Sequence, residues 1–236
     1  MLQYKKILLK FSGESLQAAD GFSIDPDKLL KYAHQVKEVV ELGVNVSVVI
    51  GGGNIYRGLN SKTTGFDRIK GDYMGMMATV INAVALQSAL ETLQIKSRVL
   101  TSFSMEPIGQ PYSQRLVKKA FENNEVVIFG GGTGNPFFTT DTAAALRAVE
   151  IGADVLLKGT RVDGVYDSDP EKNPNAKKFD EITFTEAYSK GLKIMDLTAF
   201  TMCKENNLPI IVFNVGDVTS LKKIVSGDKI GTIIKN

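Results

Sequence analysis

The sequence predicts an α/β fold, a three-layer sandwich in which helices flank a mostly parallel central sheet. Short apolar runs rich in β-branched residues alternate with longer helical patterns along the chain, and such alternation is typical of strand–helix units around a parallel sheet. The runs are apolar at nearly every position rather than at every second one. That pattern is expected of strands that are covered by helices on both faces.

Six apolar runs predict the strands of this sheet, at 7–11, 44–50, 97–100, 126–129, 154–158 and 210–213. The patterns between them predict helices at about 26–42, 72–93, 112–123, 140–151, 183–190 and 196–206. The first helix has recognisable ends, because Asp25 and Pro26 suit an N-cap and a first turn, and Gly43 suits a C-terminal stop. No low-complexity tract or linker interrupts the series, so we expect residues 1–236 to form a single domain.

Composition excludes several classes of protein. Hydrophobic residues make up 43% of the 236 residues and the formal net charge is +2, which suits a soluble globular protein and argues against a nucleic-acid partner. The single cysteine, Cys203, and the single histidine, His34, offer neither a disulfide framework nor a cluster of metal ligands, so we assign no metal site to the chain. No segment approaches 18 consecutive apolar residues, and the N-terminal apolar run is too short for a signal peptide. We therefore expect a cytoplasmic protein without a membrane partner.

Four loops that follow predicted strands are rich in glycine or small polar residues, at 10–13, 51–54, 130–134 and 158–160. Open α/β sheets bind ligands beyond the carboxyl ends of their strands, and glycine lets several backbone N–H groups converge on one anion. Two Gly-Gly-Gly turns on one sheet therefore predict two phosphate-sized sites, one for a donor and one for an acceptor. The loops match neither the Walker A motif nor the G-x-G-x-x-G spacing of a dinucleotide-binding fold.

Two lysines, Lys10 and Lys158, each end a predicted strand. A buried ammonium group is costly unless an anion pairs with it, so the two lysines suit contact with phosphate; the alternative is that each side chain extends to the surface. Asp141 follows two threonines at a predicted helix start. On the residues alone it either holds the two ammonium groups or serves as an ordinary N-cap.

The segments 10–14, 49–54, 133–141 and 158–166 resemble, in this order, the motifs of the amino acid kinase superfamily. Within it, 71–79, 133–141 and 195–197 are similar to the bacterial UMP kinase family, and the resemblance runs from about residue 4 to the C-terminus. It implies reversible transfer of the γ-phosphoryl group of ATP to UMP with Mg²⁺, giving UDP and ADP for pyrimidine nucleotide (CTP and UTP) biosynthesis. The alternatives are a carbamate or acetylglutamate kinase on the same fold, or a non-catalytic hexamer that binds nucleotides or oxyanions.

The resemblance also implies the site residues, with a UMP-binding lobe at about 1–152 and a lobe for the ATP nucleoside at 153–236. The catalytic residues it implies are Lys10, Lys158 and Asp141. Those implied for ATP are Lys10, Phe11, Ser12, Gly13, Gly53, Arg57, Thr160, Tyr166 and Asp169. Those implied for UMP are Gly52, Asp72, Thr133, Gly134, Asn135, Pro136, Phe137, Phe138, Thr139 and Thr140. Asp169 lies in a turn-like sequence, so a purely structural role stays open for it.

Assembly and regulation follow from the same resemblance, which implies a homohexamer built as a trimer of dimers. The methionine-rich helix predicted at 72–93 carries few charges, which suits burial against a second subunit. Inhibition by UTP is expected, because UTP is a product-like nucleotide that fits the UMP site. Activation by GTP stays open: Gln87 and Glu91 stand where many GTP-activated members carry a basic pair, although Arg98 remains. A carboxylate would repel a triphosphate at this place.

Overall fold

The computed structural model describes residues 2–18, 24–56 and 67–236. Among these residues nine strands form one sheet in the order β4-β3-β5-β2-β1-β6-β10-β11-β9, and β7 pairs with β8 in a separate antiparallel ribbon. The strands are β1 (Lys6–Phe11), β2 (Asn45–Ile50), β3 (Ser97–Thr101), β4 (Gln110–Pro111), β5 (Val126–Gly130), β6 (Val155–Thr160), β7 (Val165–Tyr166), β8 (Lys178–Phe179), β9 (Glu181–Thr183), β10 (Ile210–Asn214) and β11 (Thr232–Lys235). Every pairing in the large sheet is parallel except that of β10 with β11.

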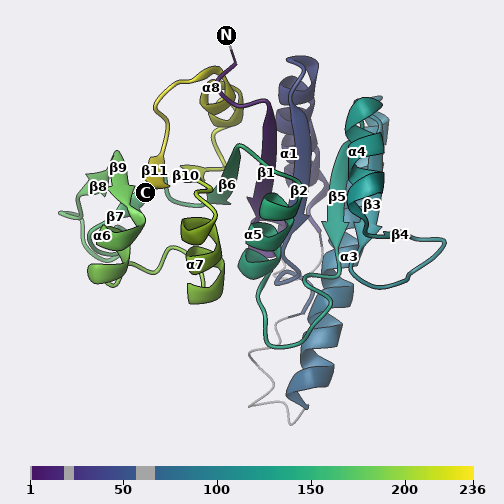
Figure 1. Ribbon diagram of the computed structural model, residues 1–236, viewed down its shortest axis with the longest axis horizontal. Helices are drawn as coiled ribbons and strands as arrows, with labels where there is room; N and C mark the ends of the chain where they lie inside the picture. Colours follow the sequence, from purple (N-terminus) through teal and green to yellow (C-terminus); the bar gives the residue numbers. More distant parts are fainter. Residues whose placement is uncertain (1, 19–23, 57–66) are drawn as a thin grey trace.

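Helices cover both faces of this sheet (Figure 1). They are the short 3₁₀ helix η1 (Gly13–Leu16) and the α-helices α1 (Pro26–Glu41), α3 (Arg68–Thr92), α4 (Gln114–Glu122), α5 (Thr140–Glu150), α6 (Phe184–Ser189), α7 (Leu197–Glu205) and α8 (Ser220–Ser226). Helices α1, α3 and α8 pack on one face and α4, α5, α6 and α7 on the other, each group with its own hydrophobic core. The predicted three-layer α/β sandwich is confirmed.

All six predicted strands and all six predicted helices are present, with ends that shift by a few residues. The largest shift is at α3, which begins at Arg68 because the side chain of Asp67 accepts a hydrogen bond from the backbone N–H of Lys70 and caps the helix. The sequence does not predict η1, α8 or the strands β4, β7, β8, β9 and β11. Apart from α8, which has seven residues, these elements have four residues or fewer, too few to show a hydrophobic period.

Helix α3 is long and apolar enough to cross a membrane by those two criteria alone. Half of its most apolar stretch is, however, buried inside the protein, where α3 packs against α1, β3 and β5. The helix therefore belongs to the core of the sandwich. Its N-terminal half extends past the end of the sheet in Figure 1, toward the loops that follow the strands.

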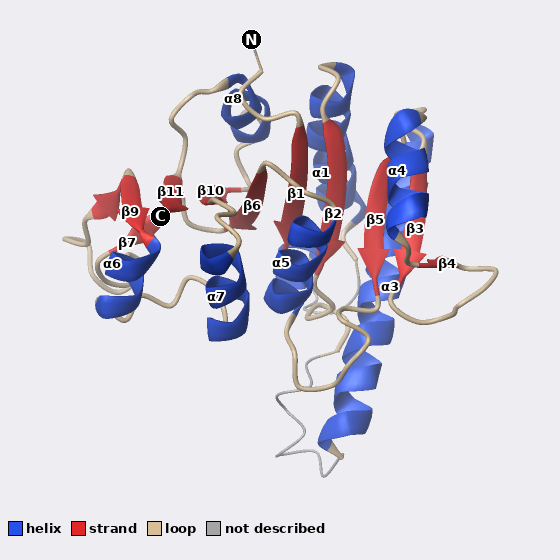
Figure 2. Ribbon diagram, viewed as in Figure 1, coloured by secondary structure: helices blue, strands red, loops and turns tan. Residues whose placement is uncertain are grey.

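The carboxyl ends of β1, β2, β5 and β3 point to the same edge of the sheet, as the arrowheads in Figure 2 show. Strands β2, β5, β3 and β4 lie on one side of β1, and β6, β10, β11 and β9 follow on the other. The junction of β1 with β6 is therefore where the chain's first half meets its second. Open α/β sheets place their ligands at such a switch point.

Candidate active site

Lys10, Lys158 and Asp141 form one cluster at the β1–β6 junction. Lys10 of β1 and Lys158 of β6 occupy paired positions in these parallel strands, so their side chains leave the same face of the sheet. The Lys10 ammonium group lies 2.6 Å from Oδ1 of Asp141, and that of Lys158 lies 2.6 Å from Oδ2. Lys158 also donates a 2.6 Å hydrogen bond to the backbone carbonyl of Ile194. Neither lysine extends into solvent, since the side chains are only 10% and 12% exposed.

Thr139, not Asp141, is the N-cap of α5. The Thr139 hydroxyl accepts hydrogen bonds from the backbone N–H groups of Asp141 and Thr142. The Asp141 carboxylate is thereby left to its two lysines, and the alternative reading of Asp141 as an ordinary N-cap is wrong.

The charges of the cluster do not cancel. Burial alone raises the pKa of the Asp141 carboxyl, but the nearby Lys10 and Lys158 ammonium groups together outweigh it and hold this pKa below its ordinary value. Burial lowers the pKa of Lys158, a trend that Asp141 opposes and Lys10 reinforces. Two ammonium groups face one carboxylate inside the cluster, which leaves an excess of positive charge that the nearby Asp196 carboxylate only reduces. Such an excess suits an incoming phosphate.

The loop after β1 lies directly against the loop after β2. A Cβ added to Gly13 would lie 2.4 Å from the carbonyl oxygen of Gly51 and 2.6 Å from the backbone nitrogen of Gly53. Position 13 therefore has no room for any side chain. The close approach brings the predicted phosphate-binding residues Ser12, Gly13 and Gly53 together beside the end of β1.

A cavity of about 130 Å³ lies between α3 and the loops after β2 and β5. We name it the acceptor cavity, because most of the residues predicted to bind UMP line it. Those are Gly52, Asp72, Thr133, Asn135, Phe138, Thr139 and Thr140. Gly134, Pro136 and Phe137 belong to the same loop, but they do not line the cavity.

Asp72 is held in place at the mouth of the acceptor cavity. Its carboxylate accepts hydrogen bonds from Nε of Arg68, at 3.0 Å from both oxygens, and from the backbone N–H of Phe137 at 2.8 Å. Phe137 has a positive φ of 73°, which is rare for a bulky residue and is typical of functional loops. Phe137 and Phe138 are 64% and 49% exposed, so neither belongs to the core.

A second cavity, of about 500 Å³, lies beyond the end of β6. Thr160, Tyr166 and Asp169, all predicted to contact ATP, line this nucleoside cavity together with Lys190 and Lys193. Asp169 also supports its own turn, because its carboxylate accepts a hydrogen bond from the backbone N–H of Glu171. Its structural role is therefore real, and it does not exclude a contact with ligand.

Two further residues predicted for ATP are Phe11 and Arg57. Phe11 is fully buried and stacks on Tyr32 with a ring separation of 4.6 Å, so only its backbone is available to a ligand. Arg57 lies outside the described residues. Its role stays a prediction.

Sequence reasoning missed how Asp196 joins the two halves of the site. Its carboxylate accepts hydrogen bonds from the hydroxyls of Thr139 at 2.5 Å and Thr142 at 2.8 Å, and from the backbone N–H of Ala199. Asp196 thus caps α7 and ties it to the start of α5. The sequence did contain a signal for Asp196, because segment 195–197 is similar to the UMP kinase family. That similarity did not assign a role to the residue.

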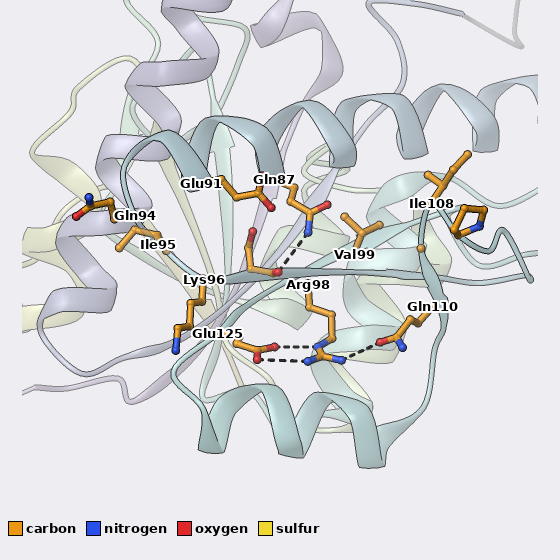
Figure 3. A pocket seen from close by; sticks show the side chains of 13 residues that line it. Gln87, Glu91, Gln94, Ile95, Lys96, Arg98, Val99, Ile108, Gln110 and Glu125 are labelled. Carbon is orange, nitrogen blue, oxygen red and sulfur yellow. Dashed lines mark hydrogen bonds and ion pairs between the residues drawn. The ribbon is translucent and has the colours of Figure 1, made fainter.

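A third cavity, of about 540 Å³, opens between α3 and β3 and lies apart from the lysine cluster. Gln87 and Glu91 project into it from α3 (Figure 3). Arg98 on β3 is already occupied there: it forms a two-pronged ion pair with Glu125, at 2.8 and 3.3 Å, and donates to Gln110 at 2.8 Å. This Arg98 cavity therefore holds a neutralised guanidinium group, the Glu91 carboxylate and the Lys96 ammonium group.

Comparison with known proteins identifies the family of this chain. The family model described as the amino acid kinase family matches residues 5–214. The chain belongs to the amino acid kinase family.

Its similarity within that family is to uridylate kinases. The uridylate kinase of Bacteroides thetaiotaomicron is 58% identical over 236 residues, which span the full length of both chains. The crystal structure of UMP kinase from Bacillus anthracis matches with a TM-score of 0.95 at 35% identity, covering 98% of this chain and 96% of the other. That of UMP kinase from Ureaplasma parvum has a TM-score of 0.93 at 40% identity, with complete coverage of both chains. The chain groups with the uridylate kinases of its family.

Proposed function

We propose that this protein is a UMP kinase, which transfers the γ-phosphoryl group of ATP to UMP and gives UDP and ADP in a reversible reaction. The observation that carries the proposal is the cluster of Lys10, Lys158 and Asp141 at the β1–β6 junction, in a chain with full-length similarity to uridylate kinases. Such a reaction supplies the pyrimidine nucleotides UTP and CTP.

The two substrates would meet at the lysine cluster. UMP would enter the acceptor cavity, whose lining residues fall between positions 52 and 140. The ATP nucleoside would enter the nucleoside cavity, whose lining residues fall between positions 160 and 212. This division supports a UMP-binding lobe up to about residue 152 and a second lobe from 153 onward.

Transfer needs alignment and neutralisation of charge rather than a general base. The UMP phosphate is already largely ionised near pH 7, so one of its oxygens can attack the γ-phosphorus in line. Lys10 and Lys158 would stabilise the negative charge that spreads over the transferred group, and glycine-loop N–H groups would fix its position. Asp141 would keep the two ammonium groups together before ATP arrives.

Magnesium would enter this site with ATP. Within residues 2–18, 24–56 and 67–236, no group of three His, Cys, Asp or Glu side chains could hold a metal ion. That fits Mg²⁺ bound mainly by phosphate oxygens and water, as is usual for this ion. When bound it neutralises charge on the ATP phosphates, while Lys10 and Lys158 act on the transferred group.

Regulation would differ between the two expected nucleotides. UTP would inhibit by occupying the acceptor cavity with its uridine monophosphate part. GTP would activate weakly or not at all, because the guanidinium group of Arg98 is already paired with Glu125, and Glu91 adds negative charge to the cavity. A triphosphate would have to displace Glu125 and face the repulsion of Glu91.

Assembly into a homohexamer, built as a trimer of dimers, is supported by the outer face of α3. Ile69, Tyr73, Met77, Ile81 and Val84 lie at helical spacing along one face and are 38–52% exposed. A continuous apolar stripe of this kind is typical of an interface. Met76, by contrast, is buried in the subunit itself. An assembly of this kind would work in the cytoplasm.

A coupled assay tests the proposal by offering ATP and Mg²⁺ with UMP, CMP, carbamate or acetylglutamate. We expect rapid turnover with UMP and little with the other three acceptors. Turnover only with carbamate or acetylglutamate would assign the protein to another kinase of the fold. Tight binding of UMP and ATP without turnover would show a non-catalytic nucleotide-binding protein.

A further inference from the structure

Helix α3 carries two buried polar side chains, Thr79 and Asn82, on the face that meets the glycine loops. They are 3% and 0% exposed and lie three residues apart, which places them on the same side of a helix. A buried polar group is costly without hydrogen bonds. Each of the two has a hydrogen-bond partner in a different glycine loop.

Thr79 binds the loop after β5. Its hydroxyl accepts a 2.8 Å hydrogen bond from the backbone N–H of Gly131 and donates one of 2.7 Å to the carbonyl of Met76. Gly131 and Gly132 have φ values of 84° and 59°. This bond therefore holds the loop where the chain makes a left-handed turn into the acceptor cavity.

Asn82 binds the loop after β2. Its amide nitrogen donates hydrogen bonds to the carbonyl of Gly51 at 2.7 Å and to Oδ1 of Asn54 at 2.8 Å. The amide nitrogen of Asn54 returns a 3.1 Å bond to Oδ1 of Asn82. Both ends of the Gly51–Asn54 turn are thus fixed to one buried side chain.

The loops are also pressed against α3 itself. A Cβ added to Gly52 would lie 2.7 Å from Cβ of Ala78 and 2.9 Å from the carbonyl oxygen of Gly75. One added to Gly130 would lie 3.1 Å from a methyl carbon of Val80. Both segments therefore lie too close to α3 to admit a side chain, and the bonds of Thr79 and Asn82 resist movement away from it.

We propose that Thr79 and Asn82 are positioning residues for phosphoryl transfer, and that α3 acts through them to fix the separation of the two glycine loops. The inference rests on the proposed UMP kinase function. In-line transfer tolerates little displacement, since a 1 Å misplacement can cost on the order of 100-fold in rate. One rigid helix that holds both loops gives the two phosphates a fixed spacing.

The two residues have different effects, because their loops differ in what they contact. Thr79 and Gly132 of the loop after β5 both line the acceptor cavity, so the loss of the Thr79 hydroxyl weakens UMP binding. The Gly51–Asn54 turn meets the acceptor cavity through Gly52 and abuts Gly13 through Gly51 and Gly53. Loss of the Asn82 amide therefore disturbs the alignment of both substrates and lowers kcat.

The test compares Thr79→Val, Thr79→Ser and Asn82→Leu with the wild type in the UMP assay, with melting temperatures measured alongside. Thr79→Val keeps the shape and removes the hydroxyl; we expect KM for UMP to rise about tenfold, with KM for ATP and kcat little changed. Thr79→Ser restores the hydroxyl and the wild-type KM. Asn82→Leu lowers kcat by about 10- to 100-fold.

Thr92→Val is the matched control. The Thr92 hydroxyl makes the same kind of bond to a carbonyl three residues earlier, that of Ala89, at the far end of α3. We expect it to leave all kinetic constants unchanged. The inference is overturned if Thr79→Val has wild-type KM for UMP, or if it changes KM for UMP and ATP equally. An inactive wild type would instead overturn the proposed function, so the two failures are distinguishable.

Discussion

Lys10 and Lys158 lie opposite each other in adjacent parallel strands, and the two oxygens of one carboxylate, that of Asp141, bind their ammonium groups. The register of β1 against β6 is what brings them together. A shift of one residue in either strand would turn one lysine to the other face of the sheet. The apolar core that fixes this register, with Leu9 on one face and Leu8 on the other, therefore also fixes the geometry of the cluster.

Replacing either lysine with alanine should lower kcat far more than it raises KM for UMP. Removing one group that stabilises transition-state charge costs about 100- to 1,000-fold in kcat, while the acceptor cavity remains intact in Lys10→Ala and Lys158→Ala. Steady-state kinetics with varied UMP measures both constants. Lys6→Ala, at the opposite end of β1, is the matched control and should retain full turnover. Unchanged turnover in Lys10→Ala or Lys158→Ala would remove that lysine from the mechanism.

The pH dependence of kcat/KM should show an alkaline limb that belongs to Lys158. Burial, reinforced by Lys10, lowers the pKa of this lysine below its ordinary 10.5 despite Asp141. The ammonium form is the active one, so activity is present below that lowered pKa and is lost as the pH rises through it. In Lys158→Arg the guanidinium group stays charged, and the limb should move to higher pH even though the rate falls. The same limb in wild type and variant would assign it to another group.

The sequence was sufficient for the parts of the site that follow strands. A lysine at the end of an apolar run, or three glycines directly after such a run, indicates the carboxyl edge of a sheet. This inference does not depend on which residues the lysine or the glycines contact in the fold. Lys10, Lys158 and the turns at 51–53 and 130–132 could therefore be named in advance. The role of Asp141 could not, because the choice between a cap and an ion pair depends on whether Thr139 takes the cap position.

The parts that depend on distant contacts were beyond the sequence. Thr79 and Asn82 read as minor interruptions of an apolar helix, and nothing local shows that they reach residues 131 and 51. In the sequence, Gly13 looks like a glycine chosen for flexibility. In the structure, glycine is required at this position because an added Cβ would lie 2.4 Å from the carbonyl oxygen of Gly51. In each case the deciding partner lies in another loop or strand, which only the folded chain brings near.

Asp72→Ala should weaken UMP binding and leave ATP binding nearly intact. The carboxylate lines the acceptor cavity and holds the Phe137 N–H, so its loss removes an acceptor for ribose hydroxyls and loosens the loop that carries Phe138. Loss of hydrogen bonds to a charged group corresponds to a rise of about 10- to 100-fold in the dissociation constant, which calorimetry can measure for each nucleotide. Arg68→Ala, which breaks the Arg68–Asp72 pair but keeps the carboxylate, should weaken UMP binding less than Asp72→Ala does. Equal losses for ATP and UMP in Asp72→Ala would contradict the assignment.

GTP should leave the rate of the wild-type protein unchanged at UMP concentrations below KM. Arg98 is bound by Glu125 and Gln110, and Glu91 and Lys96 line the same cavity, so a triphosphate meets Lys96 but finds Arg98 already paired. Replacing both carboxylates, as Glu91→Gln with Glu125→Gln, releases Arg98 and should allow GTP to bind, as measured by fluorescence of a labelled GTP analogue. Strong activation of the wild type would show that the effector displaces Glu125 or binds elsewhere.

A charge placed on the outer face of α3 should disrupt the assembly without unfolding the subunit. Ile81 is the most exposed residue of the apolar stripe, at 52%. Ile81→Lys therefore changes no core contact in the subunit but buries an unpaired ammonium group in any interface formed there. An unpaired charge buried in an interface destabilises it by roughly 3–5 kcal/mol. That is enough to shift a hexamer toward smaller species, which sedimentation experiments at micromolar concentration can detect. Lys118→Ala, a fully surface change on α4 at 81% side-chain exposure, is the control and should sediment as the wild type. A hexamer that persists in Ile81→Lys would mean that subunits meet through another face, and the exposed stripe would then need a different partner.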